Sequence, residues 1–131
     1  MSNLNLAIIT PEGKLFEGEA EYVNLPGSEG RFEVLEKHMN FIASLIPGVV
    51  EISVSGVKKH FIVFDGIAEV NASSCSVLVE KGLDVKDINK EKASEALSSA
   101  QHDLAKAETE SLKSQLTKEV MYLEAILGFS H

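Results

Sequence analysis

Few residues of this 131-residue chain have the type and spacing that catalysis requires. The single cysteine, Cys75, could act as a nucleophile with His60 as its base, and the chain would then be a small hydrolase. A lone cysteine is, however, most often a small buried hydrophobic side chain. The four histidines lack the spacing of metal ligands, and no GxxxxGKS/T or GxGxxG phosphate-binding motif is present. We predict that the chain is not an enzyme and holds no metal.

Two other groups of residues have ordinary structural interpretations. Glu17, Glu19 and Glu21 occupy alternate positions, as side chains on the exposed face of a strand do. The backbone of residues 27–30 could form a nest for an anion, but the carboxylate of Glu29 would repel one. We therefore expect a solvated strand face and a plain loop.

The charge of the chain excludes several classes of partner. Twelve Lys and Arg against twenty Asp and Glu give a net charge of −8. Binding to nucleic acid or to an anionic membrane surface requires clustered basic residues, so we predict neither. No apolar run approaches the roughly 20 residues of a membrane-spanning helix. No Lys or Arg precedes Lys14, so the start of the chain lacks the features of a signal peptide, and we expect a cytosolic protein without membrane insertion.

Composition divides the chain into two parts, which we take as residues 1–84 and 85–131. The first part contains eight of the nine glycines and all three prolines, whereas the second contains six of the eleven alanines. Glycine and proline favour turns between strands, and alanine favours helix. We expect a β domain followed by a helical domain.

Alternating apolar residues predict individual strands in the first part. Ser55-Gly56 and Asp65-Gly66 lie between such runs and are typical of hairpin turns, because glycine adopts positive φ readily. The runs that we assign to strands cover residues 4–8, 50–55, 57–64, 67–71 and 75–80. Short strands joined by regular turns predict an antiparallel sandwich or barrel.

The second part contains two apolar stripes at helical spacing. The first stripe comprises Ala93, Leu97, Ala100, Leu104 and Ala107, and the second comprises Leu112, Leu116, Val120, Leu123 and Leu127. We expect a first helix over residues 88–107, with Asp87 or Asn89 as its cap, and a second helix that stops at Gly128. Residues 108–111 contain no Gly or Pro, so one long helix remains an alternative. The small alanines favour a hairpin, because they allow two helices to approach closely.

Four motifs in order resemble the epsilon subunit of bacterial F-type proton-transporting ATP synthases. They are IITPEGKLFEGE at residues 8–19, LPGSEG at 25–30, LIPGVVEI at 45–52 and GIAEV at 66–70, with His38 between the second and third. The similarity extends over about residues 4–127.

The resemblance implies a non-catalytic subunit of the rotor. In that family a ten-stranded sandwich of two sheets binds the gamma subunit and rests on the ring of c subunits, at the cytoplasmic face of the bacterial inner membrane. The two C-terminal helices either fold on the sandwich or extend toward the alpha and beta subunits and inhibit ATP hydrolysis. One copy per complex is expected, as a peripheral protein. The residues that match the ring-contacting loop are Ser28, Glu29, Gly30, Arg31 and His38.

Departures from the family pattern lead to two further expectations. Glu33 and Asp65 stand where the family commonly has Gly, so we expect a more charged ring loop, and we expect the turn at Asp65 to tolerate the change. Some relatives bind ATP through a motif that corresponds to residues 88–93, where Asn89 replaces Asp and Lys92 replaces Arg. Lysine lacks the planar fork of arginine, so we predict weak or no ATP binding. We also expect surplus Val and Phe residues to form an apolar patch for gamma.

An adaptor protein is the alternative to a rotor subunit. A free-standing β-sandwich with a helical tail that binds a partner would need the same sheet face and the same amphipathic helices. Residue patterns alone do not separate the two functions, and the family resemblance favours the first.

Overall fold

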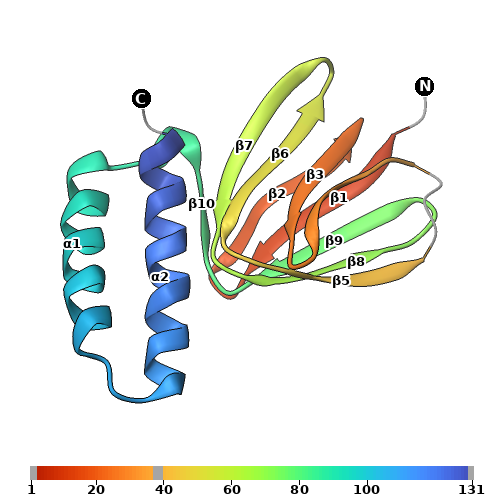
Figure 1. Ribbon diagram of the computed structural model, residues 1–131. Coiled ribbons are helices and arrows are strands. Elements are labelled where there is room, and N and C mark those ends of the chain that lie inside the picture. Colours follow the sequence, from red (N-terminus) through yellow and green to blue (C-terminus); the bar gives the residue numbers. More distant parts are fainter. Residues whose placement is uncertain (1–2, 37–39, 130–131) are drawn as a thin grey trace.

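The structure, a computed structural model, describes residues 3–36 and 40–129 of the chain. Ten strands come first: β1 (Leu4–Thr10), β2 (Gly13–Ala20), β3 (Tyr22–Gly27), β4 (Gly30–Val34), β5 (Phe41–Leu45), β6 (Gly48–Val54), β7 (Val57–Val63), β8 (Gly66–Val70), β9 (Ser74–Val79) and β10 (Gly82–Asp84). A short 3-10 helix, η1 (Val85–Asp87), leads to α1 (Lys90–Lys106) and α2 (Glu110–Phe129). The expected sandwich followed by a helical hairpin is confirmed (Figure 1).

The strands form one hydrogen-bonded path that folds back on itself. Their order is β10-β7-β6-β3-β5-β8-β9-β1-β2, and β4 pairs with β3 beside this path. The end strand β2 packs against β6 and β10, which closes two layers over a common core. The pairs are antiparallel except β1 and β9, which lie parallel. The sequence pattern gave no indication of this parallel pair.

The inner core explains why the alternating runs fold as strands. Leu4, Leu6 and Ile8 of β1 are each at most 2% exposed, and Val50 and Ile52 of β6 are fully buried. These side chains belong to one cluster that fills the space between the two layers. The turn between β6 and β7 has positive φ at Ser55 and Gly56, as the hairpin signal predicts.

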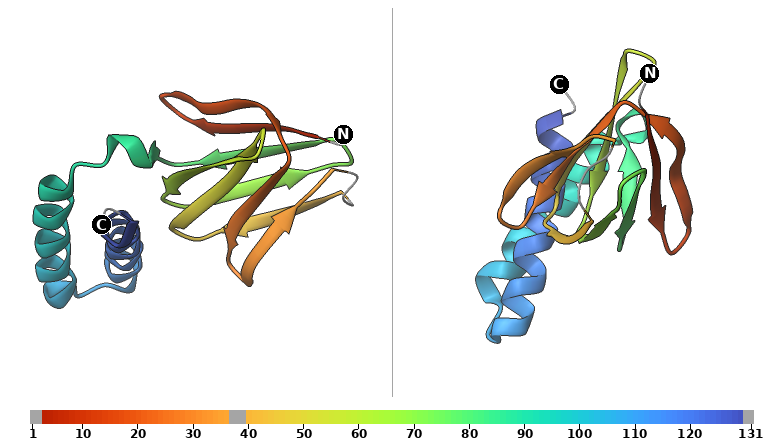
Figure 2. Two further views of the ribbon diagram at one scale, coloured as in Figure 1. Left: turned by 90° about the horizontal axis from the view of Figure 1, so that it is seen from above. Right: turned by 90° about the vertical axis from the view of Figure 1, so that its right-hand side faces the viewer.

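A second apolar cluster joins the helices to the sandwich. Ile62 and Phe64 project from β7 and the residue after it, on the face that α2 covers. α1 packs on α2 through Ala93 and Ala100. Figure 2 shows α2 between α1 and the sandwich. The helical hairpin is therefore attached to the sheet through α2.

The helices begin and end at slightly different residues from those expected. α1 begins after Asn89, whose side chain accepts a hydrogen bond from the Lys92 amide, and it has 17 residues where about 20 were expected. Its length is about 25 Å at about 1.5 Å per residue. The chain turns at residues 107–109, where Thr109 Oγ1 accepts from the Leu112 amide at 3.1 Å and starts α2. α2 continues through Gly128 to Phe129, so the expected stop at Gly128 is wrong, because glycine weakens a helix without blocking it.

Among the residues that the structure describes, no helix combines the length and the apolar character needed to cross a membrane.

Candidate functional site

The structure does not assemble the nucleophile and base that Cys75 and His60 could have formed. Cys75 is 1% exposed within the inner core, and burial raises the pKa of its thiol to about 12. His60 faces the helical side of β7, where its Nε2 lies 2.9 Å from Oε1 of Glu51. Within residues 3–36 and 40–129, no group of three or more His, Cys, Asp or Glu side chains is arranged to hold a metal ion.

The hairpin of β3 and β4 brings three of the predicted ring-contacting residues together at its tip. Ser28, Glu29 and Gly30 are all exposed, and Gly30 has a φ of +123° that favours glycine. The Ser28 amide donates to the Ser44 carbonyl of β5 at 2.9 Å, which ties the tip to the sheet. His38, the fifth predicted residue, lies outside the described part of the chain.

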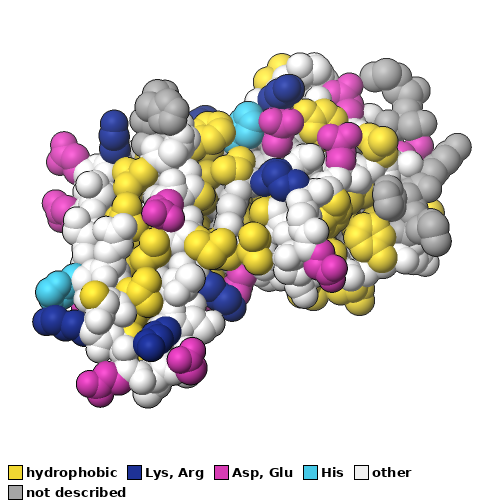
Figure 3. Space-filling model, viewed as in Figure 1, with side chains coloured by type: hydrophobic (Ala, Val, Ile, Leu, Met, Phe, Trp, Pro, Cys, Tyr) yellow, Lys and Arg dark blue, Asp and Glu magenta, His cyan; other side chains and the backbone are white. Residues whose placement is uncertain are grey.

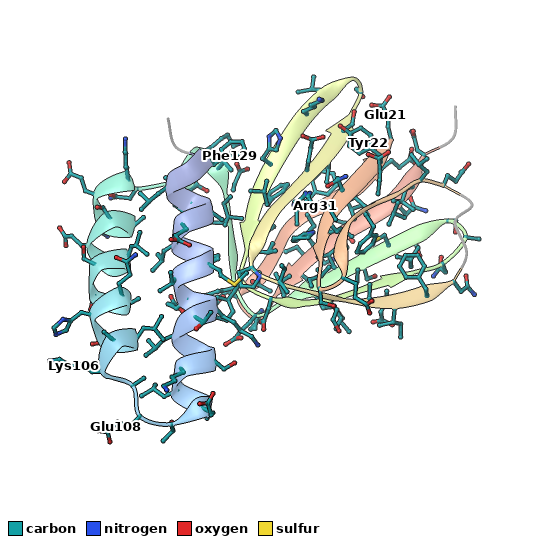
Figure 4. All side chains as sticks on the ribbon, in the orientation of Figure 1. Glu21, Tyr22, Arg31, Lys106, Glu108 and Phe129 are labelled. Carbon is teal, nitrogen blue, oxygen red and sulfur yellow. The ribbon has the colours of Figure 1, made fainter. Side chains whose placement is uncertain are left out.

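Arg31, the fourth predicted residue, does not project from the tip. Its Nε donates to Oδ1 of Asn24 at 2.7 Å, and its Nη2 donates to the carbonyl of Val49 at 2.7 Å. The guanidinium group thus lies across β3 and reaches β6 (Figure 4). Arg31 is exposed, but its Nε and Nη2 donate to atoms of its own chain.

A group of aliphatic side chains lies on the outer face of the sheet formed by β5, β8, β9 and β1. Ile42 is 69% exposed and Ile67 is 37% exposed. Cross-strand pairing places Ile67, Leu78 and Ile9 in one row, and Ile42, which pairs with Glu69, lies diagonally from Ile67 in the neighbouring row. We call Ile9, Ile42, Ile67 and Leu78 the outer apolar patch. Its composition differs from our expectation, because most Val and Phe residues lie in the two clusters and isoleucine predominates on this face.

The two predicted helical stripes are buried to different extents. Ala93, Ala100 and Leu123 are buried, and the partly buried members are Leu97, Leu104, Ala107, Leu116, Val120 and Leu127. Leu112 is 47% exposed, contrary to expectation, because it lies at the open end of the helical hairpin beside Ala107, where α1 has already ended at Lys106. Figure 3 shows hydrophobic side chains along the boundary between the helices and the boundary with the sandwich.

Sequence analysis missed the face of α2 that contacts the sandwich. Tyr122 and Ile126 are 7% and 4% exposed, and both pack with Ile62 and Phe64. Together with Phe129 they recur at spacings of 4 and 3. They form another apolar stripe on α2, separate from the leucine stripe, and it could have been recognised in the sequence. α2 is therefore apolar on two faces, one for α1 and one for the sheet.

Two ion pairs connect α2 to turns of the sandwich. Lys118 Nζ lies 2.9 Å from Oδ2 of Asp65, and this contact raises the pKa of Lys118. Lys81 Nζ lies 3.0 and 3.1 Å from the two carboxylate oxygens of Glu119. Asp65 was expected only to sit in a turn, but its carboxylate also gives this chain a contact with α2.

Aromatic contacts reinforce the same interface. The rings of Phe64 and Tyr122 meet edge to face with centroids 5.6 Å apart, and Lys81 Nζ lies 4.7 Å from the Phe64 centroid. Burial raises the pKa of Tyr122 to about 12. Near the C-terminal end of α2, the Phe129 ring lies 4.8 Å from the His60 ring.

A polar network supports the strands beneath Phe129. The Tyr22 hydroxyl donates to Oε2 of Glu51 at 2.7 Å, and His60 approaches Oε1 of the same carboxylate. The hydrogen bond from Tyr22, followed by that from His60, lowers the pKa of Glu51. The same bond raises the pKa of Tyr22 to about 12. Glu51 thereby links β3, β6 and β7.

These features define a β-sandwich protein that carries a docked C-terminal helical hairpin. Residues 3–84 match the family described as the ATP synthase, Delta/Epsilon chain, beta-sandwich domain. The chain is 33% identical to the ATP synthase epsilon chain of Maricaulis maris over 123 residues, and the aligned region covers 94% of this chain and 92% of that relative. The epsilon chain of Rhizobium rhizogenes is 32% identical over 127 residues, covering 96% and 94%. The chain belongs to the family of ATP synthase epsilon chains.

Solved structures share the fold over its whole length. A chain in the cryo-EM structure of the Euglena gracilis mitochondrial ATP synthase (OSCP/F1/c-ring, rotational state 1) superposes with a TM-score of 0.84 at 19% identity, covering 100% of this chain and 83% of that one. A chain of the central stalk/c-ring structure from Tetrahymena thermophila gives 0.67 at 14% identity, covering 98% and 96%. At these identities the likeness establishes the fold.

Proposed function

We propose that the chain is a non-catalytic subunit of the central stalk of an F-type ATP synthase. In this role it couples proton movement through the c-ring to ATP synthesis, as one copy per complex, at the cytoplasmic face of the bacterial inner membrane. The observation that carries the proposal is the similarity to ATP synthase epsilon chains, which extends over nearly the full length of this chain and of each relative. The solved chain from Euglena, which comes from an assembly containing F1 and the c-ring, supports it through the shared fold.

The outer apolar patch is the surface that we assign to gamma. A permanent partner is expected to cover exposed aliphatic side chains, and Ile42 is the most exposed large hydrophobic residue in the described part of the chain. An Ile42→Ser substitution should weaken binding to purified gamma. The matched control is Val57→Ser on β7, where the side chain is 59% exposed but lies outside the patch. Equal losses in both variants would argue against this surface.

The tip of the β3–β4 hairpin is the surface that we assign to the c-ring. Ser28, Glu29 and Gly30 are exposed together there, and the turn is tied to β5, so the tip can present them without further ordering. Glu29 gives the tip a negative charge, whereas Glu33 is exposed further along β4, two residues from Arg31. A ring surface that carries basic side chains would complement the charge of the tip.

The helical hairpin is the part that we assign to regulation of the alpha and beta subunits. In the docked form seen here, α2 is attached by two ion pairs and by the cluster around Phe64 and Tyr122. The test compares the full chain with a chain that ends after Asp84, each reconstituted with the catalytic head and gamma. We expect both to bind gamma, and we expect faster ATP hydrolysis with the shorter chain.

Two results of this comparison would contradict parts of the proposal. Unchanged hydrolysis with normal assembly would show that the helices are not inhibitory. Loss of gamma binding would show that residues 1–84 are not a separate binding domain. Truncation bares Ile62 and Phe64, so circular dichroism and size-exclusion chromatography must first establish that the shorter chain is folded and monomeric.

Nucleotide binding by this subunit is expected to be weak or absent. The side chain of Asn89 is engaged as the cap of α1, where its Oδ1 accepts from the Lys92 amide at 3.0 Å. The side chain of Lys92 is exposed and offers a point charge in place of a bidentate fork. The net charge of −8 also repels a polyanion.

A further inference from the structure

A proline interrupts the pairing between β3 and β6. The register pairs Tyr22 with Ser53 and Asn24 with Glu51 of β6, whereas Gly27 pairs with Leu45 of β5. Pro26 thus lies where β3 passes from β6 to β5, at the position that would face Val49 if the β6 register continued. The backbone of Pro26 points toward the edge of β3 that pairs with β6. Its carbonyl accepts a hydrogen bond at 2.9 Å from the amide of Ile46, which lies in the segment between β5 and β6. Proline has no N–H, so β3 cannot supply a backbone donor to the Val49 carbonyl at this position.

Arg31 supplies the missing donor. It lies directly opposite Pro26 in the pairing of β3 with β4, and its Nη2 donates to the Val49 carbonyl at 2.7 Å. Its Nε donates at the same time to Oδ1 of Asn24, two residues before Pro26 on β3. The planar guanidinium group can make both bonds because its donors diverge in a fixed fork.

The position of this contact matters for the hairpin. β4 pairs with β3 alone, so it stands beside the main path of the sheet. The Arg31 side chain adds a connection from β4 to β6, next to the turn that carries Ser28, Glu29 and Gly30. Pro26 itself is buried and lies against Gly48, where an added Cβ would be 3.0 Å from the Cβ of Pro26.

We propose that Arg31 is a positioning residue that replaces the hydrogen bond Pro26 cannot make and so fixes the β3–β4 hairpin against β6. Its effect on a partner is indirect, through the placement of the exposed tip. The assignment of that tip to the c-ring rests on the proposed function above, whereas the role of Arg31 within the chain does not. Arg31 is thus separated from Ser28 and Glu29, which remain the contact residues.

Hydrogen exchange of the full chain tests the positioning role directly. Arg31→Ala should raise the exchange rates of β4 amides by about tenfold, the effect of losing hydrogen bonds to a charged group. Arg31→Lys should give an intermediate increase, because lysine cannot make both bonds. The matched control is Glu33→Ala, an exposed residue of the same strand, which should leave the rates nearly unchanged.

Rescue by a backbone donor provides the decisive comparison. Pro26→Ala restores an N–H opposite Val49, so the double variant Pro26→Ala/Arg31→Ala should return the β4 rates toward those of Pro26→Ala alone. Equal rates for Arg31→Ala and Glu33→Ala would overturn the proposal. If the Pro26 variants fail to fold, the comparison of Arg31→Ala, Arg31→Lys and Glu33→Ala still decides.

Binding to detergent-purified c-ring separates positioning from contact. We expect Arg31→Ala to bind more weakly than the unsubstituted chain and the double variant to regain affinity. Restored exchange rates without regained affinity would show that Arg31 touches the ring, which would overturn its purely indirect role. Absence of binding by the unsubstituted chain would contradict the assignment of the tip to the ring, and the exchange rates would still decide the role of Arg31.

Discussion

The contact between Ile126 and the sandwich provides a quantitative test of how the tail is attached. Ile126 is 4% exposed at the interface that also contains Ile62 and Phe64. Ile126→Ala removes three carbons, which at about 0.8 kcal/mol per buried methylene group costs about 2.4 kcal/mol before any cavity is counted. A cavity would increase this cost. At about 1.4 kcal/mol per factor of ten, the undocked population should rise about fifty-fold.

Native-state hydrogen exchange measures this change one segment at a time. Both α1 and α2 should exchange about fifty-fold faster in Ile126→Ala, since α1 is attached to the sandwich through α2. Amides of β1 and β9, which border the inner core, should keep their rates. Leu112→Ala is the matched control, because it removes the same number of carbons from an exposed position of α2, and its effect should stay below about tenfold.

Two results would refute this reasoning. Equal acceleration of the helices and of the inner strands would show that the chain opens as one cooperative unit, without a separable tail. Equal effects of Ile126→Ala and Leu112→Ala would show that the face containing Tyr122 and Ile126 does not hold the helix.

Three further predictions concern charges. Replacing Lys118 by Gln, or Asp65 by Asn, should speed hydrogen exchange in α2, with no additional effect when both are replaced. The effect should decrease in high salt, because salt screens an ion pair that is partly open to solvent. The lowered pKa of Glu51 means that its stabilising effect is present above its ordinary pKa of 4.5 and is lost as the pH falls through the lower folded value. In urea denaturation, the difference in the free energy of unfolding between the unsubstituted chain and Glu51→Gln should therefore shrink as the pH falls below 4.5. A difference that does not change with pH would contradict the assigned network. Isothermal titration calorimetry with ATP should give no saturable binding at low micromolar concentrations, and saturation there would show that Asn89 and Lys92 are sufficient for a site.

The sequence predicted those strands whose alternation matches the inner core. The runs containing Leu4, Leu6 and Ile8, and Val50 and Ile52, each place one face in that core, so the period of two is plain. β3 was not recognised because it ends in Pro26 and Gly27, residues that normally argue against a strand. The structure accommodates Pro26 through Arg31, a contact that no local pattern reveals.

Contacts between distant segments account for the rest of what sequence analysis missed. Asp65 was interpreted only as a tolerated turn residue, because its partner Lys118 lies 53 positions away. The parallel pairing of β1 with β9 is equally non-local. Arg31 was assigned to the ring-contacting loop by its place in a motif, which does not specify where a long side chain points. The stripe of Tyr122, Ile126 and Phe129 was present in the sequence and was overlooked beside the leucine stripe.

The central claim is that this chain is a subunit of the stalk of an ATP synthase. It is tested most directly by affinity purification of the full chain from detergent-solubilised membranes of its own organism, with every recovered protein quantified by mass spectrometry. We predict recovery of gamma, alpha, beta and c subunits, with one copy of this chain per gamma. Recovery of the chain alone, or with a partner unrelated to the ATP synthase, would contradict the account and favour the free-standing adaptor.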